Sequence, residues 1–336
     1  MRYYEIVITP VPDAKGNTPP ALIYSTMNGV FENSGALRVD LDIYQSPFHQ
    51  PTQSGALKIY GVDFFDLSQA TNLNPDYSQK PPKLASIQIS VGMSTGLPFA
   101  NASQKGLIIN GSILQAFGNW QGNLVTLDLI VTSATFNPNI NVNLSWNWAK
   151  DQNQTMEDAI RTTLGNAYPT IPIASPEGSL NPNLVSTELQ AGKYDGLYQF
   201  SDYVNKQSQQ IINQPDYFGV FISPSPLGFV LADGTVPPEK TTVINYTDII
   251  GNLTWIDVYT IQAKLVMRSD LNIGDNITFP LTSPVVNVAA STYPQLRNNI
   301  SFQGTFNIQQ IHHLGSSRQA SGNDWVTVVN AVFLNV

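Results

Sequence analysis

Two adjacent histidines near the C-terminus are the first candidates for chemistry. His312 and His313 are two of only three histidines in the chain, and the third, His49, lies in a loop-like Ser-Pro-Phe-His-Gln-Pro segment. Neighbouring side chains on a β-strand point to opposite faces, so ligands on one strand need an i, i+2 spacing. The pair is therefore expected to form hydrogen bonds near a strand end and not to bind a metal ion.

A second candidate is a pair of carboxylates in the stretch 37–43, where aliphatic and charged residues alternate. Asp40 and Asp42 share one strand face at i, i+2, which places them roughly 7 Å apart. Carboxylate pairs of glycosidases have similar separations. A general acid, however, needs burial to raise its pKa, and this pattern buries the opposite face. A solvated acidic face is the favoured interpretation.

The third candidate is Gly92-Met93-Ser94-Thr95-Gly96, which matches the G-x-S-x-G nucleophile elbow. That elbow must open into a helix, and Leu97-Pro98-Phe99 follows it here without helical periodicity. A turn is therefore favoured. The sequence contains no phosphate-binding loop, dinucleotide fingerprint or zinc spacing. We expect no catalytic residues, cofactor or metal site, and the protein is not expected to be an enzyme.

Composition narrows the class of protein. Charged residues make up 12% of the 336 residues, about half of the roughly 25% typical of soluble chains. The net charge of -8 and the absence of any Lys/Arg-rich run argue against wrapping nucleic acid. Cysteine is absent, which excludes disulfides and thiolate metal sites. No apolar stretch is long enough for a membrane-spanning segment or a signal peptide, so synthesis in the cytoplasm is expected.

The order of expected elements indicates a mainly β chain with a small α+β middle region. Period-2 alternation dominates residues 1–150, with Trp146 and Trp148 on an inward face, and predicts an antiparallel barrel or sandwich. In residues 151–240, Thr155 resembles a helix N-cap, a second helix is expected after Ser201, and 218–234 reads as a hairpin. Strands return in residues 241–336, at 258–266, 277–279, 302–311 and 325–333.

An internal similarity links the two β regions. Residues 109–127 and 302–328 both run apolar-polar-Gly-hydroxyl-apolar, in Ile109–Ile113 and Phe302–Phe306. Both then continue to Gly-Asn and a Val-Thr pair, which aligns Val125 with Val326. Such a repeat indicates a duplicated β unit; chance similarity of two hairpins is the alternative.

Residues 246–279 and 302–328 resemble the baseplate hub proteins of contractile phages. The resemblance rests on a "Y…iiG.Pt" segment, an "iGd" turn, a "G.y.i..i.H.g" strand and a "W.T" strand. One departure is Asn252-Leu253, where the family usually has Pro before Thr. The first domain fits more loosely, through Tyr3–Thr9 and Val91–Met93. The matching structural positions are Tyr246, Gly251, Thr254, Gly274, Asp275, Gly304, His313, Gly315 and Trp325.

The resemblance implies two tail-tube-like antiparallel β-barrels per chain, at 1–150 and 241–336, separated by the middle region. It also implies a homotrimer whose six barrels form a pseudo-hexameric ring between the tail tube protein and the central spike protein. Other baseplate proteins would surround it, and genomic DNA would pass through its lumen without specific binding. The expected location is the baseplate of the virion tail.

Two further expectations follow from that resemblance. The type VI secretion spike protein VgrG shares this module and continues into further domains, whereas this chain stops at Val336, so a separate spike subunit is expected. Asp40 and Asp42 become candidates for lumen-facing acids that repel phosphate.

Two other classes of function compete with a hub. A glycan- or receptor-binding β protein of the tail tip would need exposed aromatic side chains, and Trp120, Trp146 and Trp148 are available, although the last two alternate as inward residues. A hydrolase would use Asp40 and Asp42, or Ser94.

Overall fold

The computed structural model describes residues 2–12, 16–17, 19–46, 52–78, 82–94, 101–133, 142–149, 154–186, 188–214, 217–235, 241–279, 302, 304–319 and 324–334. His49, Thr95, Gly96, Gly322 and Asn323 lie outside these residues. The helices are α1 (Phe64–Ser68), α2 (Ala70–Leu73), α3 (Met156–Ala167) and α4 (Leu197–Ile212). The strands are β1 (Arg2–Thr9), β2 (Leu22–Ser25), β3 (Met27–Asn28), β4 (Phe31–Glu32), β5 (Arg38–Ser46), β6 (Thr52–Tyr60), β7 (Ser86–Met93), β8 (Gly106–Gln121), β9 (Leu124–Ser133), β10 (Leu144–Trp148), β11 (Gln190–Tyr194), β12 (Phe221–Ser225), β13 (Gly228–Ala232), β14 (Thr241–Val243), β15 (Thr254–Trp255), β16 (Thr260–Val266), β17 (Asn276–Thr278), β18 (Thr305–Ser316) and β19 (Trp325–Leu334).

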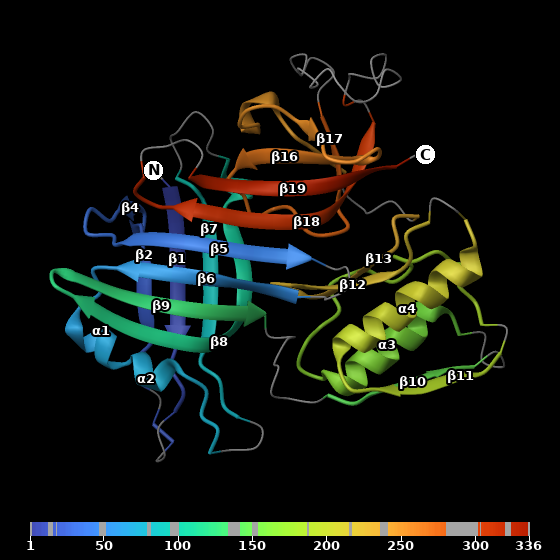
Figure 1. The fold of residues 1–336 in the computed structure, drawn as a ribbon, viewed down its shortest axis with the longest axis horizontal. Coiled ribbons are helices and arrows are strands. Elements are labelled where there is room, and N and C mark those ends of the chain that lie inside the picture. Colours follow the sequence, from blue (N-terminus) through green and yellow to red (C-terminus); the bar gives the residue numbers. More distant parts are fainter. Residues whose placement is uncertain are drawn as a thin grey trace.

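One large sheet runs through both β regions of the chain (Figure 1). Its strand order is β15-β16-β19-β18-β5-β6-β9-β8-β7-β1-β2, with β17 pairing β18 and β14 pairing β17 beside this path. The prediction of a mainly β chain is confirmed. The prediction of two separate barrels is not confirmed, because β18 pairs directly with β5 and joins the two regions into one open, curled sheet.

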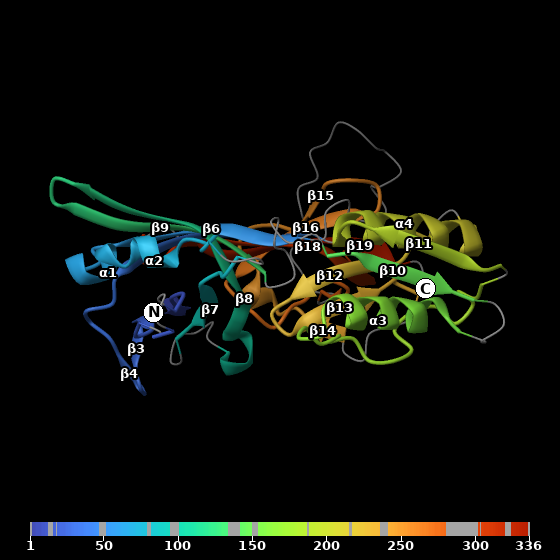
Figure 2. The same ribbon diagram turned by 90° about the horizontal axis from the view of Figure 1, so that it is seen from below.

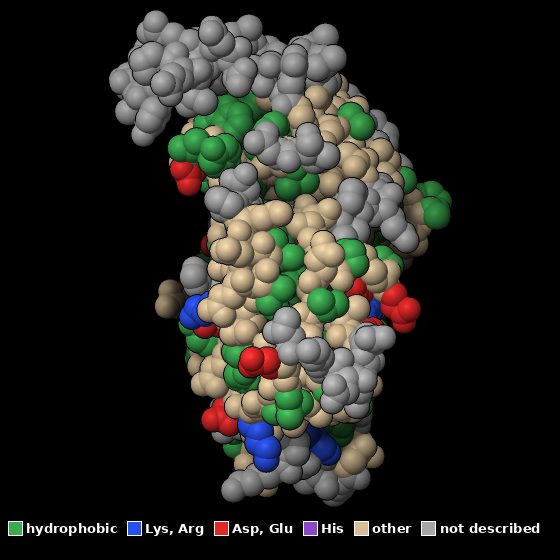
Figure 3. All heavy atoms as spheres, turned by 90° about the vertical axis from the view of Figure 1, so that its right-hand side faces the viewer, with side chains coloured by type: hydrophobic (Ala, Val, Ile, Leu, Met, Phe, Trp, Pro, Cys, Tyr) green, Lys and Arg blue, Asp and Glu red, His purple; other side chains and the backbone are tan. Residues whose placement is uncertain are grey.

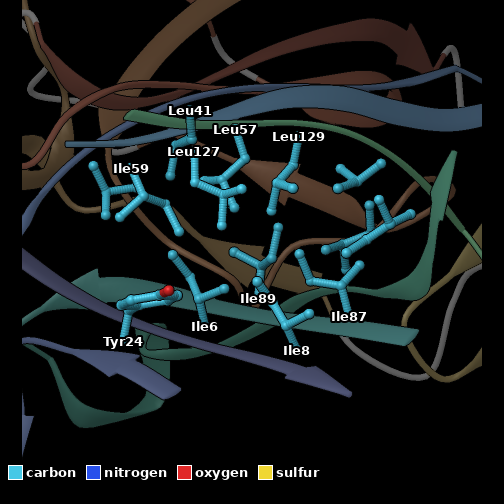
Figure 4. Close-up of a cluster of buried hydrophobic side chains, with 14 of the residues drawn as sticks. Ile6, Ile8, Tyr24, Leu41, Leu57, Ile59, Ile87, Ile89, Leu127 and Leu129 are labelled. Carbon is cyan, nitrogen blue, oxygen red and sulfur yellow. The ribbon is translucent and has the colours of Figure 1, made fainter. Parts of the chain in front are cut away.

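The N-terminal part of the sheet folds back on itself around a hydrophobic core (Figure 4). Leu41, Leu57 and Leu129 descend from the front strands β5, β6 and β9, and meet Ile6 and Ile89 from the back strands β1 and β7. β8 is shared by both layers, and its bulge between Ile113 and Gln115 lies where the sheet leaves one layer for the other. A bulge adds local twist and bend, so it allows one strand to serve both layers.

The middle region packs beside the sheet as a small α+β unit with its own core (Figure 2). Thr155 and Asp158 form a capping box at the start of α3, as the sequence predicts. The prediction for the second helix is wrong at its start, because α4 begins at Leu197 after Gly196 and not after Ser201. The sequence analysis also missed β11, which lies in a Pro/Gly/Ser-rich stretch and pairs with β10.

A third core cluster lies under β16, β18 and β19 and includes Ile261, Phe306 and Val329. The domain limits 1–150, 151–240 and 241–336 stay a prediction. Of the helices that the structure describes, none combines the length and the apolar character that a membrane crossing requires.

We expect opposite effects from alanine at two glycines. Gly55 pairs with Ile43, and an added Cβ would lie 2.2 Å from the carbonyl oxygen of Asp42. Gly55→Ala should therefore lower the free energy of unfolding by about 1–3 kcal/mol through overpacking against backbone. Gly165→Ala should raise it by up to about 1 kcal/mol, because Gly165 sits in α3 with nothing within 4 Å of the added Cβ. Urea unfolding measures both, and destabilisation by Gly165→Ala or none by Gly55→Ala would contradict this packing.

Candidate functional site

The large sheet contains the same five-strand connectivity twice. We call β5–β9 unit 1 and β15–β19 unit 2. In each unit the strands lie in the order first, second, fifth, fourth, and the third pairs with the fourth. Every pairing within both units is antiparallel. The two units therefore follow one another head to tail along a single sheet.

The bulges of the two hairpins give the residue correspondence between the units. The ladder shifts between Ile113 and Gln115 in β8–β9 and between Ile308 and Gln310 in β18–β19. Superposing these shifts aligns Val125 with Trp325, one residue away from the alignment that the sequence similarity suggests. A slip of one residue exchanges the two faces of a strand. The sequence thus identified the right pair of hairpins but aligned their residues wrongly.

Unit 2 joins unit 1 through the antiparallel pairing of β18 with β5, from Ile311–Gln45 to Ser316–Asp40. The two histidines lie on opposite faces at this junction, as the strand argument requires. His312 Nε2 lies 2.6 Å from Asp42 Oδ1 and its ring meets Tyr44 edge-on at 5.8 Å. His313 is buried, and its Nδ1 lies 3.0 Å from Thr327 Oγ1.

A buried polar seam reinforces the junction beneath the sheet. We define it by Arg268, Asp248, Asp270 and Gln104. Arg268 is 2% exposed. Its guanidinium donates to the Asp270 carboxylate through Nε and Nη2, at 2.7 Å each, and to Asp248 Oδ2 through Nη1 at 3.2 Å. Gln104 Nε2, from unit 1, donates to the same Asp248 oxygen at 2.9 Å. The seam therefore ties the loop before β8 to unit 2 with charge-assisted hydrogen bonds.

The seam continues through residues that the sequence singled out. Thr327 Oγ1 accepts from the Arg268 amide at 3.0 Å, and Trp325 Nε1 donates to the Gly92 carbonyl at 2.9 Å. Burial, with a smaller contribution from His312, lowers the pKa of His313 to about 3. His313 is therefore neutral at physiological pH, which suits a side chain enclosed in a core. Trp325 and Gly92, from the two halves of the family resemblance, are in direct contact.

The remaining resemblance positions lie in two other places. The Gly274 amide donates to the Ile308 carbonyl at 2.8 Å, and the Asp275 carbonyl accepts from the Ile308 amide at 2.9 Å, so this turn fastens β17 to β18. Gly304 and Gly315 have positive φ, and a Cβ on Gly315 would lie 2.0 Å from the carbonyl oxygen of Asp324.

Tyr246, Gly251 and Thr254 lie apart from the seam, near the β15 edge of the sheet. Tyr246 is 55% exposed and Thr254 is also exposed, while Gly251 has φ +80 in the turn before β15. Their role as family positions stays a prediction.

Asp40 and Asp42 lie on β5 on the face that points away from the core, which we call the front face, and each lies beside a nitrogen partner. Arg38 Nη2 donates to Asp40 Oδ2 at 2.7 Å, and Tyr60 Oη donates to the same oxygen at 2.9 Å. Burial alone would raise the pKa of Asp40, but hydrogen bonds from Arg38 and Tyr60 hold it below its ordinary value. A raised pKa, which a general acid needs, is therefore not what this environment produces.

The front face as a whole is balanced in charge. Across the described strands of the two units it carries three carboxylates and three basic side chains, which cancel while His312 is neutral. They are Asp40, Asp42, Asp128, Arg38, Lys58 and Lys264. Lys58 Nζ lies 3.2 Å from Asp128 Oδ1. Asp40 and Asp128 therefore have cationic partners on this face, whereas Asp42 contacts His312, and the expectation that Asp40 and Asp42 face a lumen stays a prediction.

The other sequence candidates lie in different surroundings. Ser94 is 4% exposed and its Oγ has no hydrogen-bond partner among the described residues. Trp146 and Trp148 are buried in the middle region, whereas Trp120 is 64% exposed at the end of the β8–β9 hairpin. Within the described ranges, no group of three or more acidic or histidine side chains is arranged to hold a metal ion.

The seam residues themselves were missed from the sequence. Arg268 and Asp270 are spaced i, i+2, which puts both side chains on one side of an extended chain and could have suggested the pair. Asp248 and Gln104 carry no such signal, because tertiary structure brings them to Arg268 from 20 and 164 positions away.

Removing the Arg268 cation should be far more costly than removing an exposed one. Arg268→Met leaves Asp248 and Asp270 without their partner, and breaking a buried pair costs about 3–5 kcal/mol. Arg38→Met removes the partner of Asp40 at a half-exposed position, where the loss is at most about 1 kcal/mol. Equal losses of unfolding free energy in urea titrations would show that the seam does not hold the junction.

Comparison with known proteins identifies the fold. No protein-family model matches this chain, and no curated protein matches it. The structure is similar to a tail protein from Neisseria meningitidis MC58, with 10% identity and a TM-score of 0.51 over 99% of this chain and 97% of that one. It is also similar to the 43 kDa tail protein of prophage MuSo2 from Shewanella oneidensis (9%, TM-score 0.48, 98% of both chains). A Francisella PdpA–VgrG complex aligns with 8% identity and a TM-score of 0.45, over 100% of this chain and 53% of that one. The first similarity shows that the chain has the fold of a tail protein over nearly its whole length.

Proposed function

We propose that this protein is a structural hub of a phage tail baseplate and has no catalytic role. Three chains form a ring of six similar units, which joins a sixfold tail tube protein to a threefold central spike protein. Other baseplate proteins surround the ring, and genomic DNA passes through it. The protein acts in the virion tail after synthesis in the host cytoplasm.

The repeated unit carries this proposal. Units 1 and 2 share one connectivity and lie head to tail in one sheet. A chain with two equivalent units presents six of them when three chains associate, and so matches sixfold symmetry on one side and threefold symmetry on the other. The tail-protein fold supports a place in a tail assembly.

The chemistry of the front face suits a channel for DNA. Phosphate binding requires uncompensated Lys or Arg side chains, and Lys58 and Arg38 on this face are each held by a carboxylate. A different side of the molecule, the right-hand side of Figure 1, is shown in Figure 3, where the charged side chains of the described residues are scattered and form no large patch of either sign. A lining whose charges balance has little attraction for DNA phosphates.

A receptor-binding role is the second candidate, and the exposed Trp120 favours it. Its ring packs edge-on against Phe64 at 4.9 Å, and both side chains are more than half exposed. The other two tryptophans considered for such a site, Trp146 and Trp148, are buried in a core. One exposed aromatic pair is a smaller basis for glycan binding than the repeated unit is for a ring.

Sedimentation velocity tests the hub proposal. We expect the chain, alone or co-expressed with the spike protein of the same phage, to form a species that contains three copies of the 36.8 kDa chain. Electron micrographs of that species should show a central pore. A monomer under both conditions would contradict the proposal, and binding of glycans by that monomer would support the receptor-binding candidate.

Charge reversal tests whether the front face lines the channel. Replacing Asp40 and Asp42 together with Lys frees Arg38 and adds cations, which should slow genome ejection from assembled phage, most strongly at low salt. The Asp40→Asn/Asp42→Asn variant is the matched control: it also frees Arg38 but adds no cation, so it should slow ejection less than the lysine variant. Ejection at the normal rate from virions that contain the lysine variant would place this face away from the DNA.

A further inference from the structure

The run of strands from β15 to β8 leaves one equivalent pairing unused at each of its two ends, although β7, β1 and β2 continue the sheet from the first half of β8. Within the chain, β18 of unit 2 pairs with β5 of unit 1. The counterpart of β18 is β8, and the counterpart of β5 is β15. Resting on the proposed trimer, we infer that β8 of one chain pairs antiparallel with β15 of the next, which repeats the internal junction between chains.

One half of β8 is open for this pairing. Residues Gly106–Ser112 pair with β7 on one side, but beyond the bulge Gln115–Gln121 has β9 as its only strand partner in the described part of the chain. The corresponding half of β18, Ile311–Ser316, is occupied by β5. Phe117 is 50% exposed and Trp120 is 64% exposed, while Leu67 and Phe64 of α1 pack against one face of this half, at Gly118 and Trp120, and leave its hydrogen-bonding edge without a strand partner in the described residues.

A side chain marks where the open edge begins. Asn74 Nδ2 donates to the Ala116 carbonyl at 3.0 Å, and Asn74 Oδ1 accepts from the Ala116 amide at 2.9 Å. Asn74 thus takes both backbone groups of Ala116 that point away from β9. Because backbone direction alternates along a strand, Gly118 and Trp120 present their amides and carbonyls on this same edge. The pairing between chains therefore starts at Gly118.

The opposite end of the sheet offers the complementary edge. Among the described strands, β15 pairs only with β16, through Thr254–Gln262 and Trp255–Ile261. Its counterpart β5 has partners on both sides, β6 and β18. Exposed apolar side chains follow β15 directly, with Ile256 49%, Val258 51% and Tyr259 58% exposed. An edge strand with exposed apolar neighbours is a ready template for another strand.

The internal junction also fixes the register of the proposed one. The bulges of the two hairpins make Asn119 in β8 the counterpart of Leu314 in β18. Following the paired residues across unit 1 from β9 through β6 to β5, and across unit 2 from β19 through β16 to β15, makes Thr254 the counterpart of Asp42. Leu314 pairs with Asp42 inside the chain, so Asn119 should pair with Thr254 of the next chain.

The same register brings exposed apolar groups together. Phe117 then faces Ile256, at the position where His312 meets Tyr44 within the chain. The two edges belong to different strands, so the contact is head to tail, and the threefold axis of the proposed trimer closes it into a ring.

Engineered disulfides test this register, because the natural chain has no cysteine. Asn119→Cys/Thr254→Cys should give a covalent trimer on non-reducing gels after mild oxidation of the protein co-expressed with its spike, since opposite strand residues lie within disulfide range. Asn119→Cys/Asn252→Cys is two residues out of register and should cross-link far less. Leu314→Cys/Asp42→Cys places the bond at the internal junction and should close within one chain.

The outcomes separate this interface from the proposed function. If the Asn119→Cys/Thr254→Cys variant sediments as a trimer but forms no disulfide between chains, or if the out-of-register variant cross-links more, the interface is overturned and the hub stays intact. A monomer in all variants, with or without the spike, overturns both. Circular dichroism and thermal unfolding of each reduced variant establish that it is folded, so failure to cross-link counts against the pairing and not against the variant.

Discussion

The antiparallel pairing of β18 with β5 is the constraint on which the rest of the structure depends. It turns two five-strand units into one sheet and fixes the angle between them. The Arg268 seam lies beneath this pairing and holds the loop before β8 against unit 2. A buried ion pair adds little net stability compared with apolar packing. Its strict geometry, however, makes other arrangements of the two units costly, because any displacement leaves charges unpaired.

The chemistry of the two sheet faces differs in a way that suits an assembly protein. The inner face supplies Ile, Leu and Val side chains to the cores, and the front face carries polar and charged groups together with the exposed Tyr44, Phe117 and Ile130. In the proposed hub, low charge across the whole sequence would follow from two demands, contact with neighbouring subunits and a lining that does not bind DNA. Both demands belong to the proposed hub, and neither requires an active site.

Local patterns made part of this structure predictable. Alternation placed Asp40 and Asp42 on one face and buried Trp146 and Trp148, and the capping box at Thr155 located α3. These features depend on residues within a few positions of each other. The start of α4 was missed because Gly196 offers no capping side chain.

The long-range features could not be read from the sequence in the same way. Two barrels were expected because β regions flank the middle region, but nothing local announces that β18 pairs with β5 across more than 260 residues. The alignment of Val125 with Val326 failed for a similar reason, since it followed a local Val-Thr match, whereas the correspondence of the two hairpins is set by how each one pairs. Asp248 and Gln104 joined the candidate site only through tertiary structure.

A cryo-electron microscopy reconstruction of the hub bound to its spike measures the central claim most directly. Two rotations are compared. The first superposes unit 1 on unit 2 within one chain, and the second superposes unit 2 of that chain on unit 1 of the adjoining chain. We expect both rotations to be about 60° around one axis, as six equivalent positions in a closed ring require. Two clearly different rotations, or units that do not superpose, would contradict the account.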